Sequence, residues 1–298
     1  MFKGITNDQF NQYFQSEEDC LEYLAQLKWA IGYQCQKCGN ASWWKGRLPH
    51  DRRCQVCGYN ESPTAGTLFH QLKFNLLKAF QICFKLSVRK KGMSSCELSR
   101  EYGIRQTTAW YFKRKVQQAM KSSGKYLIQG RVEVDEFTVG QKEEGFQGRA
   151  KGSRKIVAVA VEKVERNQMM GRAYAECIAS YGSEDLQGFV ERHIDAKARI
   201  ITDGWTGYTP IRESYRKLEQ KKSEEGKNFP VLHIHIMNLK GWLRGIHHHC
   251  SQQNMQGYLD EYHFRFNRRN HLDTILDKLL RRMVAGKPLY LTLRAQSG

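Results

Sequence analysis

The chain lacks any stretch that approaches about eighteen consecutive apolar residues, the length that a membrane-spanning helix needs. Its first twenty residues also lack the apolar core of a secretory signal peptide, and they become acidic at Glu17 and Glu18. We therefore expect a cytoplasmic protein without a membrane span. In that compartment the nine cysteines are more often thiols or metal ligands than disulfides.

The chain also has few acidic residues relative to its basic ones. The chain has 30 Asp and Glu against 48 Lys and Arg, which gives a formal net charge of +18. This surplus indicates a polyanionic partner, because neutralising phosphates releases counterions and drives binding. A merely basic protein is the alternative. With 298 residues, 40% of them hydrophobic, the chain is long enough for two domains or for one domain with appendages.

Four of the cysteines form two close pairs. Cys35 and Cys38 are separated by two residues, Cys54 and Cys57 are spaced in the same way, and a glycine follows each pair. Two such knuckles bring four thiolates into the tetrahedron that zinc prefers. Since four protein ligands fill the coordination shell, we predict a structural Zn²⁺ site. We expect the other cysteines to be packing residues.

The segment between the two knuckles is basic and aromatic. It places Trp43 and Trp44 beside several Lys and Arg residues, which suits contact with nucleic acid. The two tryptophans could equally cover the knuckles, and the sequence favours neither reading.

Two short helices are predicted between residues 94 and 120. Ser94 and Glu97 match a capping box, and Gly103 interrupts the helical pattern before a second helix. This arrangement suits a DNA-binding helix-turn-helix, although an unrelated helical pair would give a similar pattern. The positive charge and the cysteine pairs favour DNA binding. The second helix would offer to DNA the side chains of Arg105, Gln106, Thr107, Thr108, Lys113 and Arg114.

From about residue 126 the pattern changes to β-branched and alternating runs, which predict strands. Asp135 lies within or at the end of the first strand, and Asp203 ends a later apolar run. Carboxylates at strand ends can converge on Mg²⁺ or Mn²⁺, and two such ions about 4 Å apart support phosphodiester transfer. The alternative for each aspartate is a turn or a helix cap.

Residues 233–250 contain five of the ten histidines. His233 and His235 are two positions apart, as on one side of a strand, whereas 247–249 are contiguous and so point in different directions. The spacing therefore favours phosphate contacts or packing over a metal site, and the first two histidines could be core strand residues.

Taken together, these motifs resemble bacterial insertion-sequence transposases of the DDE superfamily, in the group with an N-terminal zinc ribbon. The resemblance covers most of the chain. It is carried by "LKWAIGYQCQKCG", "SPTAGTLFHQLKF", "ELSREYGIRQTTAW", "VEVDE", "IITDGWTGY", "MNLKGWLRGIHHH" and "GYLDEYHFRFNRR".

The resemblance implies an RNase H-like catalytic fold and assigns roles within it. Asp135 and Asp203 correspond to the first two catalytic acids and to ligands of a catalytic Mg²⁺ or Mn²⁺. Asn238 corresponds to the third position, as in a subgroup that has asparagine followed closely by a lysine, here Lys240. The 35 positions from Asp203 to Asn238 are also similar to the usual spacing.

A second signature follows in the same stretch. Glu261, Arg265 and Arg268 resemble the Glu-Arg-Arg pattern of that subgroup and would share one helical face. With Arg244, the two arginines would contact DNA or brace the site. Because the amide of the third position carries no charge, the site holds two formal negative charges rather than three. Glu136 or Glu261 could compensate.

The sequence thus predicts a multidomain α+β protein with an N-terminal zinc ribbon and helix-turn-helix before an RNase H-like α/β catalytic domain. The expected regions are 1–62 for the helical leader and ribbon, 63–125 for the helix-turn-helix, and 126–298 for the catalytic domain with a helical tail. The expected function is DNA transposition on double-stranded DNA by a homo-oligomer. A nuclease that cuts without joining and a non-catalytic regulator are the alternatives.

Overall fold

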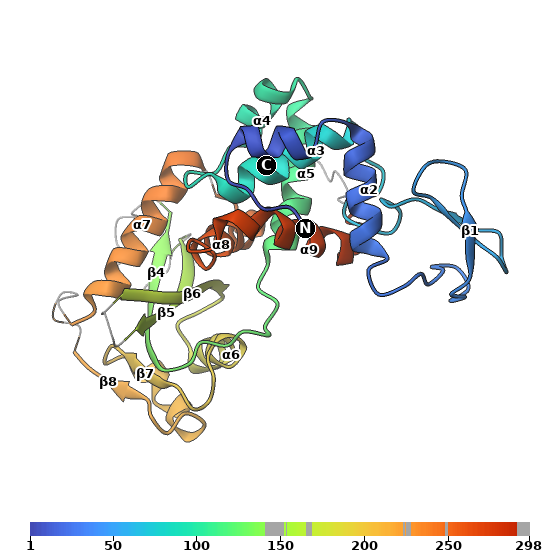
Figure 1. Cartoon of the computed structure of the whole chain (residues 1–298). Coiled ribbons are helices and arrows are strands. Elements are labelled where there is room, and N and C mark those ends of the chain that lie inside the picture. The colour runs from blue at the N-terminus through green and yellow to red at the C-terminus, as the bar shows by residue number, and fades with distance from the viewer. Residues whose placement is uncertain are drawn as a thin grey trace. The chain divides into compact units, whose positions relative to one another are not determined.

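The structure is a computed structural model, drawn in Figure 1, in which the chain divides into two compact units. Unit 1 comprises Met1–Met120 and Asn270–Gly298, and unit 2 comprises Lys121–Arg269. The residues that the structure describes are 1–140, 152, 154–164, 169–222, 224, 228–247 and 250–290. Among these residues, no helix combines the length and the apolar character needed to cross a membrane.

Unit 1 is built mainly of helices, and the capping box predicted at Ser94 is present. Capping boxes at Thr6, Ser16 and Ser94 begin three of them, because each hydroxyl accepts a backbone N–H that has no partner inside the helix. The helices are α1 (Asn7–Tyr13), α2 (Glu17–Lys28), α3 (Leu76–Val88), α4 (Ser95–Tyr102), α5 (Gln106–Met120) and α9 (Ile275–Ala285).

The C-terminal helix α9 packs in unit 1, against α2, α3 and α5. We expected residues 126–298 to form one region, the catalytic domain with its helical tail, whereas α9 of this tail belongs to unit 1. Its apolar face explains this placement, since Leu276, Leu279 and Met283 are fully buried. The Tyr23 hydroxyl also donates to Asp277 Oδ1 over 2.5 Å.

A three-stranded antiparallel ribbon completes unit 1. It consists of β1 (Trp43–Lys45), β2 (Arg52–Cys54) and β3 (Asn60–Glu61), in the order β1-β2-β3. Its small core contains Trp29, Tyr33, Cys35 and Cys54. The segment that carries the two cysteine pairs therefore forms short strands.

Unit 2 contains a five-stranded mixed sheet in the order β6-β5-β4-β7-β8. Strands β4, β5 and β6 pair antiparallel, and β7 and β8 then extend the sheet in parallel beside β4. The strands are β4 (Arg131–Val139), β5 (Lys155–Val164), β6 (Met169–Ile178), β7 (Arg199–Thr202) and β8 (Glu219–Gln220).

Helices cover both faces of this sheet. On one face, α6 (Ser183–His193) packs with Val132, Val134 and Ile200. On the other, α7 (Pro230–Ile246) and α8 (Gln252–Phe266) pack over Phe137, Val157 and Ile201. Two short 3₁₀ turns, η1 (Thr206–Tyr208) and η2 (Pro210–Glu213), follow β7, and η4 (Leu272–Thr274) precedes α9.

The interpretation of His233 and His235 as strand residues is wrong, because both lie in α7. Pro230 occupies the first turn of this helix, where its missing N–H costs nothing. The apolar positions recur at helical spacing and bury Leu232, Leu239 and Leu243. His235 lies on that buried face. The spacing of the two histidines by two positions had suggested a strand, although the segment is helical.

Candidate functional site

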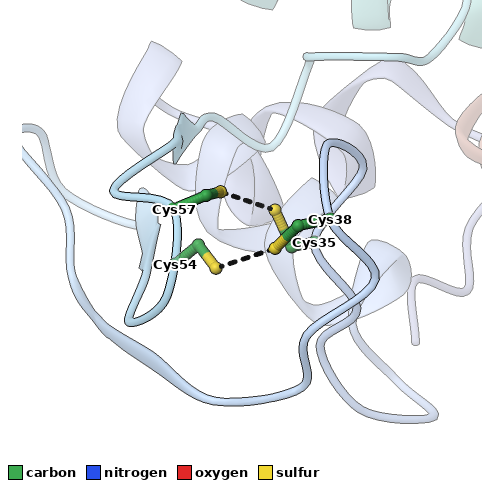
Figure 2. Close-up of side chains that lie close together, drawn as sticks. All are labelled: Cys35, Cys38, Cys54 and Cys57. Carbon is green, nitrogen blue, oxygen red and sulfur yellow. Dashed lines mark hydrogen bonds between the residues drawn. The ribbon is translucent and has the colours of Figure 1, made fainter.

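The four predicted cysteine ligands converge on one point in the ribbon, with all four sulfur atoms within 4.8 Å of one another. Figure 2 shows the two knuckles facing each other, with Cys35 Sγ 3.6 Å from Cys57 Sγ and Cys38 Sγ 3.5 Å from Cys54 Sγ. A tetrahedral zinc site with Zn–S bonds of about 2.3 Å needs sulfurs roughly 3.8 Å apart. The cluster could therefore bind zinc with little rearrangement.

The knuckle backbone favours the thiolate form of Cys54. Gly39 and Gly58 adopt positive φ, and their N–H groups donate to Cys35 O and Cys54 O. This turn aims further N–H groups at the sulfurs. The backbone N–H of Cys57 lowers the pKa of the Cys54 thiol to about 6, so the metal-binding form is favoured near neutral pH. The backbone N–H of Asn40 lowers the pKa of the Cys38 thiol, but hydrogen bonds with Cys54 and Cys57 together outweigh it and raise this pKa to about 12.

The predicted DNA-binding helix is present as α5, preceded by α4 and a left-handed turn at Gly103. Arg105, Gln106 and Thr107 are exposed at its start, and Thr108 is half-buried. These positions leave the first turn of α5 accessible.

The other two side chains of α5 that were predicted to contact DNA form hydrogen bonds within the protein instead. Lys113 is buried, and its Nζ donates to the carbonyl of Met93 over 2.6 Å. Arg114 is half-buried and donates to Gln117 Oε1. Their charge was visible in the sequence, but their inward direction depends on how α5 packs.

In unit 2 the sheet brings the two predicted carboxylates together. In the parallel pairing of β4 with β7, Val134 is the partner of Thr202. The next residue on each strand is an aspartate, Asp135 on β4 and Asp203 directly after β7. Because neighbouring strands lie about 5 Å apart, both side chains occupy the same edge of the sheet.

Local hydrogen bonds orient each carboxylate. Asp203 Oδ1 accepts the backbone N–H of Trp205 over 3.0 Å, which forms the turn that the sequence had left as an alternative role. Asp135 Oδ1 accepts the N–H of Glu136 over 2.8 Å. A role in a turn and a role as a metal ligand are compatible, because a carboxylate has several lone-pair directions.

Negative charge is concentrated at this edge of the sheet, and it affects the pKa of Tyr208. Burial raises the pKa of the Tyr208 hydroxyl well above its usual value, and nearby Glu136 adds to the shift. Asp135 and Asp203 raise this pKa further. The Tyr208 hydroxyl donates to Glu136, so that carboxylate already has a structural partner. A divalent cation would neutralise such a cluster, and carboxylate oxygens are the ligands that it prefers.

An open pocket lies between β4 and α7, and its lining includes Asp135, His233, Ile236 and Lys240. The Lys240 Nζ lies 5.1 Å from the centre of the Phe137 ring, which places it over β4. Burial lowers the pKa of Lys240, the charge of Arg244 lowers it further, and Asp135 opposes both effects. The pocket thus combines an anionic edge with a cationic helix face.

Asn238 does not share that helix face. It is exposed, and the lining of the pocket does not include it. Two positions along an α-helix correspond to a rotation of about 200°, so Asn238 and Lys240 point in nearly opposite directions. His233 was not among the predicted catalytic residues, yet its buried Nε2 has no hydrogen-bond partner among the residues that the structure describes.

The Glu-Arg-Arg residues lie on and just beyond α8. Glu261 and Arg265 are both buried and form an ion pair of 2.8 Å, so they brace the fold. Arg268 follows the helix, and its guanidinium lies 3.9 Å from the centre of the Phe264 ring. Arg244, on α7, is exposed. Of the three arginines predicted to act in the catalytic domain, Arg244 is thus the most accessible.

The histidine-rich stretch contributes mainly to packing. His235 and His263 are buried and joined through their Nε2 atoms over 3.0 Å, which links α7 to α8. His247 stacks on the Tyr258 ring, with centroids 3.6 Å apart. The last two predicted members, His248 and His249, lie outside the described residues.

Comparison with known proteins identifies the family of this domain. Residues 127–267 match the family of ISXO2-like transposase domains, and this range includes the aspartate pair, α7 and α8. No curated protein was found to match the chain. Residues 127–267, which carry Asp135 and Asp203, therefore form a transposase domain of the ISXO2-like family.

Proposed function

We propose that this protein is a DNA transposase that cleaves the ends of a DNA element by phosphodiester hydrolysis and joins the freed 3′-hydroxyl to target DNA. The observation that carries the proposal is the β4–β7 register, which places Asp135 and Asp203 side by side within the transposase domain. The order of the sheet, an antiparallel meander extended by parallel strands, supports the RNase H-like interpretation.

Asp135 and Asp203 would hold a catalytic Mg²⁺ or Mn²⁺. When bound, such a cation activates a hydroxyl or water and stabilises the leaving oxygen. The chain's own contribution is to fix the two carboxylates through the strand pairing and the Trp205 turn. The loop after β7 leaves the edge accessible to a DNA strand, since Gly204 and Thr206 are exposed.

Cationic groups on α7 would position the DNA backbone at this edge. Lys240 points into the pocket beside Asp135, and Arg244 lies one turn further along the same face. A phosphate held between them and the carboxylate edge would be oriented by charge-assisted hydrogen bonds. We assign Lys240 to the reacting phosphate and Arg244 to the neighbouring backbone.

Two residues of α7 compete for the third position of the site. The resemblance assigns it to Asn238, whose amide oxygen can ligate a metal. The pocket favours His233, because His233 lies on the same face of α7 as Lys240 and lines the pocket together with Asp135. The substitutions Asn238→Ala and His233→Ala separate the two assignments, since the residue that completes the site should lose far more cleavage activity when it is removed.

Unit 1 would supply recognition of double-stranded DNA. The exposed start of α5 suits the recognition helix of a helix-turn-helix, with Arg105, Gln106 and Thr107 facing DNA. The cysteine cluster would hold Zn²⁺ and fix the ribbon. Joining two element ends requires two active sites, so we propose a homo-oligomer assembled on DNA.

The test is strand cleavage and joining on a DNA duplex that carries the terminal inverted repeat of the element. The wild-type protein should nick this end with Mg²⁺ and join it to a target plasmid. Asp135→Ala and Asp203→Ala should lose both activities but keep binding the duplex. Nicking without joining would instead identify a nuclease, and unchanged nicking by Asp203→Ala would refute the active-site assignment.

A further inference from the structure

The two neighbouring tryptophans of β1 have different surroundings. Trp43 is paired with Cys54, and its ring centre lies 4.1 Å from the Arg52 guanidinium. The same guanidinium lies 4.4 Å from the ring centre of Trp29. Trp43 is therefore connected through Arg52 to the small core of the ribbon, on the side that carries the knuckles.

Trp44 faces the opposite side, because successive strand residues alternate. Its side chain is 57% exposed, and it belongs to no core cluster of the residues that the structure describes. Its cross-strand partner is Arg53, which is also exposed and forms no ion pair within the described part of the chain. One face of the ribbon thus presents an indole beside a guanidinium, and this arrangement does not cover the knuckles.

The charge of the ribbon as a whole indicates the class of partner. Residues 33–60 contain Lys37, Lys45, Arg47, Arg52 and Arg53. The only acidic residue in that range, Asp51, is buried and accepts a hydrogen bond from the Asn60 side chain. A partner that is both aromatic and anionic satisfies the indole and the cations at once, which favours nucleic acid over an apolar protein surface.

The exposed indole of Trp44 also favours single-stranded over double-stranded DNA. A base must present a free face to stack on it, and bases inside a closed duplex have none, whereas unpaired bases do. The Arg53 guanidinium beside the indole would contact the backbone of the same strand. Stacking on Trp44 therefore suits single-stranded DNA, as occurs where strands separate at a cut end.

We propose that the β1–β2 face carrying Trp44 and Arg53 binds single-stranded DNA, with one base stacked on Trp44 and the backbone held by Arg53. This binding site would differ from the duplex-binding surface proposed on α5. Its use at cut element ends rests on the proposed function, but the binding itself does not require cleavage.

The test is fluorescence anisotropy of the full-length, zinc-loaded protein with labelled oligo(dT) and, separately, with a closed hairpin duplex. Trp44→Ala should weaken oligo(dT) binding by about tenfold, and Trp44→Phe should largely restore it, because stacking is tolerant of ring type. Duplex binding should not change. Leu48→Ala is the matched control, since Leu48 is an apolar ribbon residue that is 64% exposed, and its affinities should equal those of the wild type.

Zinc content should be measured for each variant, so that loss of the ribbon is not mistaken for loss of stacking. Oligo(dT) binding by zinc-loaded Trp44→Ala equal to that of the wild type would overturn the proposal, and so would an equal loss on both DNAs. A protein that binds oligo(dT) through Trp44 but cleaves no DNA end would refute the proposed function and leave this inference intact.

Discussion

The two candidate metal sites of this chain are built in opposite ways. The cysteine cluster comes from two knuckles of local sequence, and its four sulfurs already lie within 4.8 Å of one another. The aspartate pair comes from residues 68 positions apart, and only the β4–β7 pairing brings the two together. The first site is closed by its own ligands, whereas the second is an open sheet edge. A closed site suits a structural ion, and an open one suits chemistry.

The largest expected effect concerns the closed site. Cys54→Ser should abolish zinc binding and unfold the ribbon, because structural zinc contributes on the order of 10 kcal/mol to such small modules. Zinc content and limited proteolysis of the ribbon would measure this. Cys96→Ser is the control, since Cys96 is exposed and outside the cluster. Retention of zinc by Cys54→Ser would show that the cluster is not a metal site.

The next effect concerns the buried ion pair of α8. Glu261→Ala should destabilise unit 2 by about 3–5 kcal/mol, because it leaves the buried guanidinium of Arg265 without its carboxylate. Urea unfolding would measure the loss. The exposed pair of Arg199 and Glu219 provides the control, and Glu219→Ala should cost less than about 1 kcal/mol. Similar losses for the two variants would contradict a bracing role.

The histidine pair makes the stability of unit 2 dependent on pH. Burial lowers the pKa of His263 to about 4, and burial also lowers that of His235 well below its usual value. The unfolded chain takes up protons near pH 6.5, before the folded chain does, so stability should fall as the pH drops from about 6.5 toward 4. His263 alone would account for about 3 kcal/mol over this window.

Melting temperatures measured between pH 7.5 and pH 4.5 would check this dependence. The double substitution His235→Leu and His263→Leu removes both titrating groups and should flatten the slope, whatever its effect on stability at pH 7.5. An unchanged slope in that variant would contradict the role of the pair.

The smallest expected effect concerns helix capping in unit 1. Ser94→Ala should cost about 1 kcal/mol, because the Ser94 hydroxyl accepts the N–H of Glu97 at the start of α4. Ser251→Ala is a matched control, since Ser251 occupies the N-cap of α8 without a capping hydrogen bond from its side chain. Thermal unfolding should show a larger loss for Ser94→Ala, and equal losses would contradict the importance of the box.

The sequence predicted local features well because their physics is local. The knuckles, the Ser94 capping box and the strands near Asp135 and Asp203 depend on neighbours within a few residues. Directions of side chains were harder to predict. From the sequence, Lys113 is expected to be a surface charge, but the packing of α5 directs it to the carbonyl of Met93. In the same way, α9 is expected to be a tail of the catalytic domain, but its apolar face packs in unit 1.

His233 illustrates the same limit at the candidate site. In the sequence it was one of five clustered histidines, and alternation suggested a strand. Helix α7 instead places it on the face of Lys240, in the pocket beside Asp135. A helical reading of that segment, from Pro230 and the recurring leucines, would have found this face.

Direct measurement of Mn²⁺ binding tests the central claim, that Asp135 and Asp203 form a cation site at the sheet edge. Electron paramagnetic resonance of the zinc-loaded protein should detect bound Mn²⁺, and Asp203→Asn should weaken its affinity by about tenfold or more without loss of zinc or of folded structure. Equal Mn²⁺ affinity in the wild type and in Asp203→Asn would contradict the account.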